Sequence, residues 1–148
     1  MIMQHRYDML LLSPNLKRSV EISNLCKKIL SVEPGILQVS FINRNGRMIE
    51  TTLNNSWESS QLTKQESEML SMQCTLQLSM NKEFDEKLTR VRYTIIKRES
   101  TSDFIFPMFD GVIFVIIDNA VHIQAVDNRI SDLISVYQSK IEDIEKDA

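Results

Sequence analysis

Residues 63–88 read TKQESEMLSMQCTLQLSMNKEFDEKL, and they predict a helix with apolar residues on two flanks. Thr63 and Glu66 have the spacing of a capping box, which marks the start of the helix. At 3.6 residues per turn, one flank lies within a stripe about 120° wide, and the second extends the apolar surface past half of the circumference. The first flank holds Met69, Met72, Leu76, Met80 and Phe84, and the second holds Leu70, Cys74 and Leu78. We therefore expect one flank to cover a sheet and the other to meet a partner chain.

Upstream of this helix, the sequence predicts another helix and a β-hairpin. Ser13 is suited to cap the first helix, because its hydroxyl accepts a free amide and the proline after it needs no amide bond. Two β-rich runs follow at residues 36–42 and 48–53. The turn between them contains Asn45 and Gly46, which tolerate positive φ at both turn positions and favour a tight hairpin.

Downstream of the long helix, the sequence predicts three strands and a final helix. Residues 89–99 alternate between polar and apolar side chains, as expected of a strand. Strands are also predicted at residues 104–109 and 112–117, and the second of these is apolar on both faces, so it should be central. Apolar residues from Val126 onward repeat at helical spacing. This order predicts an α+β fold, in which helices pack on the faces of a five-stranded antiparallel sheet.

The composition indicates one domain in the cytoplasm. The 148 residues are 43% hydrophobic, enough for a single core, and we expect a flexible segment at 1–12 before one domain at 13–148. No apolar run approaches the ~20 residues that cross a bilayer, and the first residues lack a small-residue cleavage site. Cys26 and Cys74 lie among apolar neighbours, which favours reduced core thiols over a disulfide.

The charge is unevenly placed along the chain. Residues 1–98 hold 14 Lys or Arg and 10 Asp or Glu, whereas residues 99–148 hold 3 and 10, so the two parts carry +4 and −7. This asymmetry either steers association with a charged partner or belongs to ordinary solvated faces. A pI near 5.4 argues against a nucleic-acid partner.

No pattern for catalysis, cofactor binding or metal binding is present in the sequence. His5 and His122 have no Cys, Asp or Glu at a recognisable metal spacing. The sequence contains no glycine-rich phosphate loop, no Gly-x-Ser-x-Gly and no Cys-x-x-Cys. We expect a protein that is not an enzyme and needs no cofactor.

The order of elements resembles the roadblock and dynein-light-chain superfamily, which is close to the longin and profilin-like folds. The turn at residues 43–46 lies where roadblock-like domains carry an Asp- and Gly-containing turn. The chain also resembles an uncharacterised family of short archaeal proteins over roughly residues 20–120. The segments that carry this second resemblance are residues 25–30, 46–47, 66–70, 82–85, 98–99 and 106–108, of which Lys82-Glu83-Phe84-Asp85 is the most specific.

The roadblock resemblance implies a homodimer. In such proteins the middle helix and the strand after it pair with their counterparts in a second chain, and the dimers act as platforms for small Ras-like GTPases. Here the pairing strand carries like charges, which discourage strand pairing at an edge, so we expect dimerisation through the helix. The residues assigned to this interface are Met69, Met72, Cys74, Leu76, Met80 and Arg92.

Three further residues are candidates for a partner surface. Trp57, in a polar stretch, is either a binding anchor or a side chain that folds back onto the sheet. Arg90 and Arg98 either grip an acidic partner or a phosphate, or they protect an edge strand. The methionines of the long helix likewise suit either an adaptable binding surface or plain core packing.

Two functions remain open at this level. The first is a regulatory or scaffolding domain that homodimerises and binds a cytoplasmic protein, such as a small GTPase. The alternative is a small-molecule sensor of profilin-like fold, which requires small residues and buried polar groups inside the fold. The residues expected to point inward are large, which favours the first function; they are Val91, Tyr93, Ile95, Phe104, Phe106, Val115 and Ile117.

Overall fold

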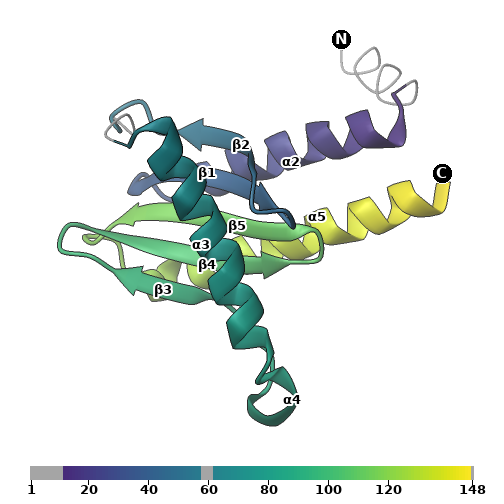
Figure 1. Cartoon of the computed structure of the whole chain (residues 1–148). Coiled ribbons are helices and arrows are strands. Elements are labelled where there is room, and N and C mark those ends of the chain that lie inside the picture. Colours follow the sequence, from purple (N-terminus) through teal and green to yellow (C-terminus); the bar gives the residue numbers. More distant parts are fainter. Residues whose placement is uncertain (1–11, 58–61, 148) are drawn as a thin grey trace.

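The computed structural model describes residues 12–57 and 62–147, so most of the predicted flexible segment at 1–12 lies outside the described residues. Figure 1 shows the helices and strands coloured in chain order. One short 3-10 helix, η1, precedes the last helix. The elements are α2 (Pro14–Leu30), β1 (Ile36–Asn43), β2 (Met48–Leu53), α3 (Lys64–Lys82), α4 (Asp85–Leu88), β3 (Thr94–Lys97), β4 (Thr101–Met108), β5 (Gly111–Asp118), η1 (Ile123–Ala125) and α5 (Asp127–Asp147).

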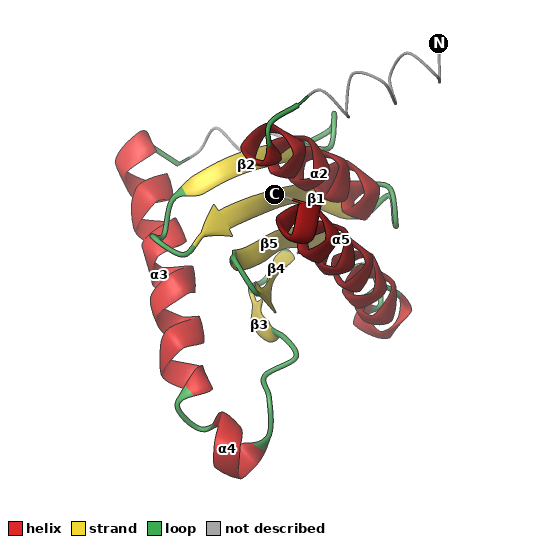
Figure 2. Cartoon of the chain, turned by 90° about the vertical axis from the view of Figure 1, so that its right-hand side faces the viewer, coloured by secondary structure: helices red, strands yellow, loops and turns green. Residues whose placement is uncertain are grey.

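The five strands form one antiparallel sheet in the order β2-β1-β5-β4-β3. The prediction that the apolar last strand is central is therefore confirmed. Figure 2 shows three layers, with α3 on one face of the sheet and α2 and α5 together on the other. The predicted α+β fold class is confirmed.

The larger part of the core lies between the sheet and the pair α2 and α5. Strand alternation sends one set of side chains to this face, including Phe104, Phe106 and Val115, which are almost fully buried. Tyr93 packs on both phenylalanine rings, with ring centroids 5.6 and 5.5 Å apart. Ile95, which was expected to point inward, is 38% exposed, because it lies on the edge strand β3.

The β1–β2 hairpin has the predicted position but not the predicted turn geometry. Gly46 has a positive φ of 80°, whereas Asn45 does not. The turn is held instead by Asn43, whose side-chain oxygen accepts hydrogen bonds from the amides of Asn45 and Arg47 at 3.0 Å. These bonds fix the turn without positive φ at a second residue.

The long helix and the strand after it are both shorter than the sequence predicted. The helix predicted at residues 63–88 ends at Lys82, where the amides of Glu83 and Phe84 bond to carbonyls three residues back and tighten the last turn. A separate short helix, α4, follows. The strand predicted at residues 89–99 is paired only over Thr94–Lys97, and continuing its register sets Arg92 opposite Pro107, which has no amide to donate.

Both cysteines are free and buried, as predicted, and this has a measurable consequence. Burial raises the pKa of Cys26 to about 12 and that of Cys74 to about 11, with smaller contributions from Glu50 and Asp103 respectively. Because the thiolate is the reactive form, we expect both thiols to react with Ellman's reagent at pH 8 at least about a hundredfold more slowly in the native protein than in urea. Rapid labelling of either thiol in the native protein would contradict the packing described above.

Candidate interaction surface

Helix α3 lies on the sheet with its second predicted flank. Its start is fixed by the capping box, in which Thr63 and Glu66 exchange two hydrogen bonds of 3.0 and 3.1 Å. Cys74 and Leu78 are buried against side chains of the sheet. The sheet and helix residues of this smaller cluster are Ile42, Cys74, Leu78, Ile105, Val112 and Phe114.

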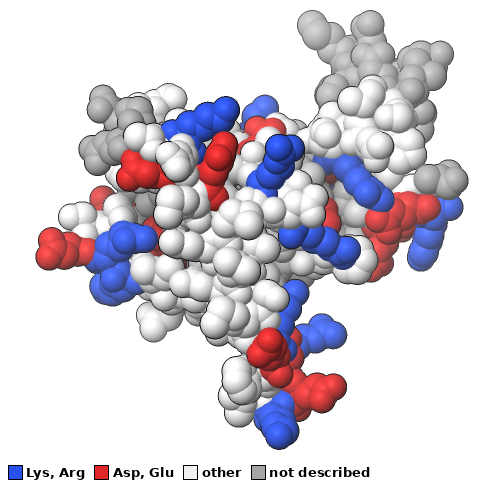
Figure 3. All heavy atoms as spheres, viewed as in Figure 1, with Lys and Arg blue, Asp and Glu red and all other residues white. Residues whose placement is uncertain are grey.

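The other flank of α3 is exposed, as the 3.6-residue spacing predicted. Its four central residues are each 48% to 65% exposed; they are Met69, Met72, Leu76 and Met80. Phe84 and Leu88 extend the exposed apolar surface toward α4, which projects beyond the sheet in Figure 1. We call the four central residues the α3 stripe. In Figure 3 uncharged side chains cover the middle of α3, while charged side chains gather at α4 and around the rim of this face.

Two residues assigned to the interface do not lie on the α3 stripe. Cys74 is only 2% exposed, because its position on the helix turns it toward the sheet. Arg92 is tied to the start of α5, where its Nη2 group donates to Asn128 Oδ1 at 3.0 Å. Its guanidinium carbon also lies 5.9 Å from the centre of the Tyr93 ring. The structure therefore leaves the four residues of the stripe as the coherent part of the predicted interface.

The residues assigned to a partner surface do not share one surface either. Trp57 folds back onto the sheet, where its Nε1 donates to Gln38 Oε1 at 3.3 Å. Arg98 is held by Asp103 at 3.0 Å beside a cleft between α3 and the sheet that Trp57 also lines, whereas Arg90 lines a different hollow, toward α5. The reading of Trp57 as a side chain packed on the sheet agrees with this geometry.

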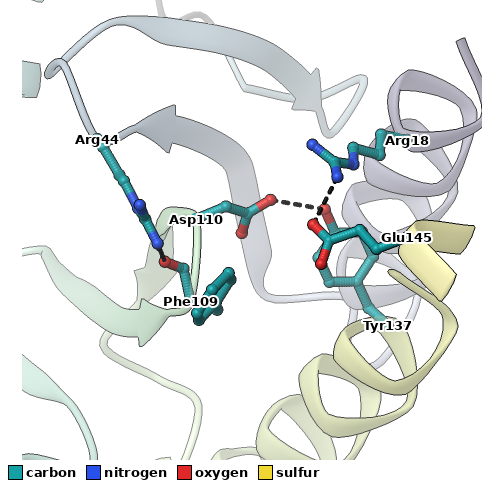
Figure 4. A network of polar contacts seen from close by, with 6 residues as sticks. All are labelled: Arg18, Arg44, Phe109, Asp110, Tyr137 and Glu145. Carbon is teal, nitrogen blue, oxygen red and sulfur yellow. Dashed lines mark hydrogen bonds and ion pairs between the residues drawn. The ribbon is translucent and has the colours of Figure 1, made fainter. Parts of the chain in front are cut away.

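Sequence reasoning missed an aromatic side chain displayed on the β4–β5 turn. Phe109 is 68% exposed, yet its backbone is held firmly, as Figure 4 shows in part. Arg44 donates to its carbonyl oxygen at 3.0 and 2.6 Å and stacks on its ring, and its amide bonds to Gln138. Next to it, the Tyr137 hydroxyl donates to Asp110 Oδ2 at 3.1 Å. The sequence places a turn at residues 110–111 but does not reveal these contacts, because the partners come from two distant segments, the β1–β2 turn and α5.

Burial is the main cause of a raised pKa at Tyr137, and the neighbouring Asp110 carboxylate raises that pKa further. The hydroxyl therefore stays protonated and remains a donor across the neutral range. Among residues 12–57 and 62–147, no group of three or more His, Cys, Asp or Glu side chains is placed to hold a metal ion. None of the helices that the structure describes is long and apolar enough to cross a membrane.

Known structures show the same fold at low sequence identity. A roadblock/LC7 domain from Streptomyces avermitilis is 10% identical with a TM-score of 0.64, and the match covers 81% of this chain and 97% of that chain. MglB from Myxococcus xanthus is 14% identical with a TM-score of 0.66 over 82% and 95% of the two chains. Profilin II from Acanthamoeba castellanii is 11% identical with a TM-score of 0.51 over 80% and 98%.

Comparisons of the sequence alone, by contrast, find no match. No protein-family model and no curated protein sequence matches the chain, so the resemblance to short archaeal proteins stays a prediction. The structural matches cover 80% to 82% of this chain. The chain therefore has the fold shared by roadblock/LC7 domains and profilins.

Proposed function

We propose that this chain is a non-enzymatic interaction module that forms a homodimer through α3 and binds a protein partner. The observation that carries the proposal is the α3 stripe, in which four large apolar side chains stand exposed along one helix face. Contiguous exposed apolar residues on a folded domain mark interaction surfaces. Methionine suits such a surface, because its flexible side chain adapts to the facing residues.

The charges at the two ends of α3 itself favour a second copy of the chain as the occupant. Glu66 lies in the first turn of α3 and Lys82 in its last turn, whereas the residues of α4 beyond it are of mixed charge. In an antiparallel pair related by a two-fold axis, the acidic end of each helix faces the basic end of the other. The stripe in the middle would then meet its own copy.

A continuous sheet across the dimer is disfavoured by the edge strand. The unpaired stretch before β3 carries Arg90 and Arg92, and β3 itself ends in Lys97. Two copies of this edge would bring like charges together, which opposes strand pairing. We therefore propose a dimer that uses helices alone.

The proposed partner of the dimer is a small Ras-like GTPase. This rests on the roadblock resemblance of the sequence and on the roadblock/LC7 fold of the structure. The absence of a metal or nucleotide motif from the sequence fits a module that acts by binding. A purified Ras-like GTPase from the same organism, loaded with GDP or with a non-hydrolysable GTP analogue, is the probe for this step.

The solution mass of the purified protein tests the homodimer. We expect size exclusion with light scattering to give about 34 kDa, twice the chain mass of 17.2 kDa. The mass should hold on dilution to about 1 μM, because a dissociation constant below that level requires only about 8 kcal/mol of binding free energy. A constant mass of one chain across the whole dilution series would refute self-association through α3.

A further inference from the structure

A group of polar side chains is buried on the sheet face beneath α3. Gln38 on β1 and Asp103 on β4 are 7% and 3% exposed, and both pair with Ile116 of the central strand. Ser40 and Thr51 continue the polar group in the next row, with their hydroxyl oxygens 3.0 Å apart. Five of the seven residues expected to point inward, all but Val91 and Ile95, pack on the α2 and α5 side. The opposite face of the sheet keeps this layer of polar side chains.

A cleft of about 560 Å³ opens above this polar layer. Its volume lies within the range of small-molecule sites. The sheet forms one wall, and the N-terminal half of α3 forms the other through Ser67, Leu70 and Gln73. Trp57 closes one side, and it is oriented by its hydrogen bond to Gln38. The cleft therefore joins an aromatic and aliphatic wall to a polar base.

The base of the cleft carries one positive and one negative group, and the carboxylate of Glu66 lines the cleft from the side of α3. Arg98 donates from Nε and Nη2 to Asp103 Oδ2 at 3.1 and 3.0 Å. The side chain of Asp103 is 5% exposed, whereas that of Arg98 is 55% exposed. Both bonds end on one oxygen, and within residues 12–57 and 62–147 neither Oδ1 of Asp103 nor Nη1 of Arg98 takes part in this pair. A buried carboxylate lowers the stability of the folded chain unless it is paired. Here Asp103 is paired, and its partner Arg98 remains accessible to solvent.

We infer that this cleft binds a small zwitterion of the α-amino acid class. The balanced pair favours a ligand with one ammonium and one carboxylate, because a ligand of either single charge would face one like charge. The ligand carboxylate would accept from Arg98, its ammonium would donate to Asp103, and its side chain would lie against Trp57 and Leu70. Met69 lines this cleft and also belongs to the α3 stripe, but residues of a single chain form the cleft, so its binding test does not require the homodimer.

The fluorescence of Trp57 provides a direct test, because it is the only tryptophan in the chain. The full chain is titrated with each of the common L-amino acids, and calorimetry repeats every titration for ligands that leave the emission unchanged. We expect saturable binding of at least one amino acid. The corresponding amine without the carboxylate, and the acid without the ammonium, should bind about tenfold or more weakly, which is a loss of about 1.4 kcal/mol.

Two variants of the Arg98–Asp103 pair and one matched control test whether the ligand binds in this cleft. Arg98→Gln and Asp103→Asn should each weaken binding by about tenfold or more, whereas Arg90→Gln, which removes a charge outside this cleft, should not. If Asp103→Asn does not fold, the binding measured with Arg98→Gln still tests the inference, because the Arg98 side chain is half exposed. Lack of binding by any amino acid at about 10 mM in calorimetry, or equal binding by Arg98→Gln and the natural chain, would overturn the inference.

Discussion

We expect the double variant Leu76→Glu/Met80→Glu to be a folded monomer. Both side chains are more than half exposed on the α3 stripe, so glutamate there meets solvent in a single chain. In a dimer, burying each Leu or Met side chain is worth about 1.5–3 kcal/mol, and a two-fold axis counts every change twice. We therefore expect self-association to weaken by more than about a hundredfold, which corresponds to about 2.7 kcal/mol.

Light scattering and circular dichroism together decide this experiment. The variant should elute with the mass of one chain and keep the helical spectrum and melting temperature of a folded domain. Val136→Glu is the matched control, because it places the same charge at an aliphatic residue that is 53% exposed on α5, across the sheet from α3. A double variant that remains dimeric would contradict the α3 interface, and one that unfolds would show that the stripe is part of the protomer core.

The choice of Leu76 and Met80 over Met72 follows from the packing of the hairpin turn. A side chain at Gly46 would come within 2.4 Å of Met72 Sδ, so Met72 already covers this turn inside its own protomer. A charge at Met72 would therefore disturb the protomer and the proposed interface together. Leu76 and Met80 separate the two effects.

Much of the fold could be predicted because the apolar residues repeat with the periods of helices and strands. The division of α3 into two flanks could be predicted, since the period of 3.6 separates Met69, Leu76 and Met80 from Cys74 and Leu78 on any helix. The placing of Cys74 with the interface residues did not follow this period, and Cys74 is buried against the sheet. The break after Lys82 could not be predicted, because the apolar pattern continues to Phe84 and Leu88. Their exposure shows that this continuation serves no intramolecular packing.

The polar cleft could not be predicted because it depends on strand register. Gln38 and Asp103 lie in strands that contain other polar residues, such as Ser40 and Ser102, so each alone is typical of an ordinary strand residue. Only the pairing of both β1 and β4 with β5 sets them on either side of Ile116. Arg98 and Trp57 were noticed in the sequence, but the residues they contact lie 5 and 19 positions away.

We expect Gly111→Ala to be the most destabilising single methyl addition among the three glycines. Gly111 begins the central strand, opposite Asn43 on β1 and Met108 on β4. A Cβ there would lie 2.1 Å from the carbonyl oxygen of Ile42, and the backbone φ of 154° is one that side chains rarely adopt. The obstacle is the backbone of β1 at the fully buried Ile42, so β1 and β5 would have to separate locally.

The expected loss is about 3 kcal/mol or more, because strain and a broken strand pair act together. For a chain of this size, that loss lowers the melting temperature by about 10 °C, which thermal circular dichroism measures directly. Gly35→Ala is the matched control, since its added Cβ meets the Val121 Cγ2 atom at 2.1 Å, at the end of a side chain that is able to rotate. If Gly111→Ala melts no earlier than Gly35→Ala, the close approach of β1 and β5 at Ile42 is not the constraint described here. A lower melting temperature for Gly111→Ala alone would instead show that the close pairing of β1 and β5 at Ile42 fixes the β4–β5 turn that carries Phe109.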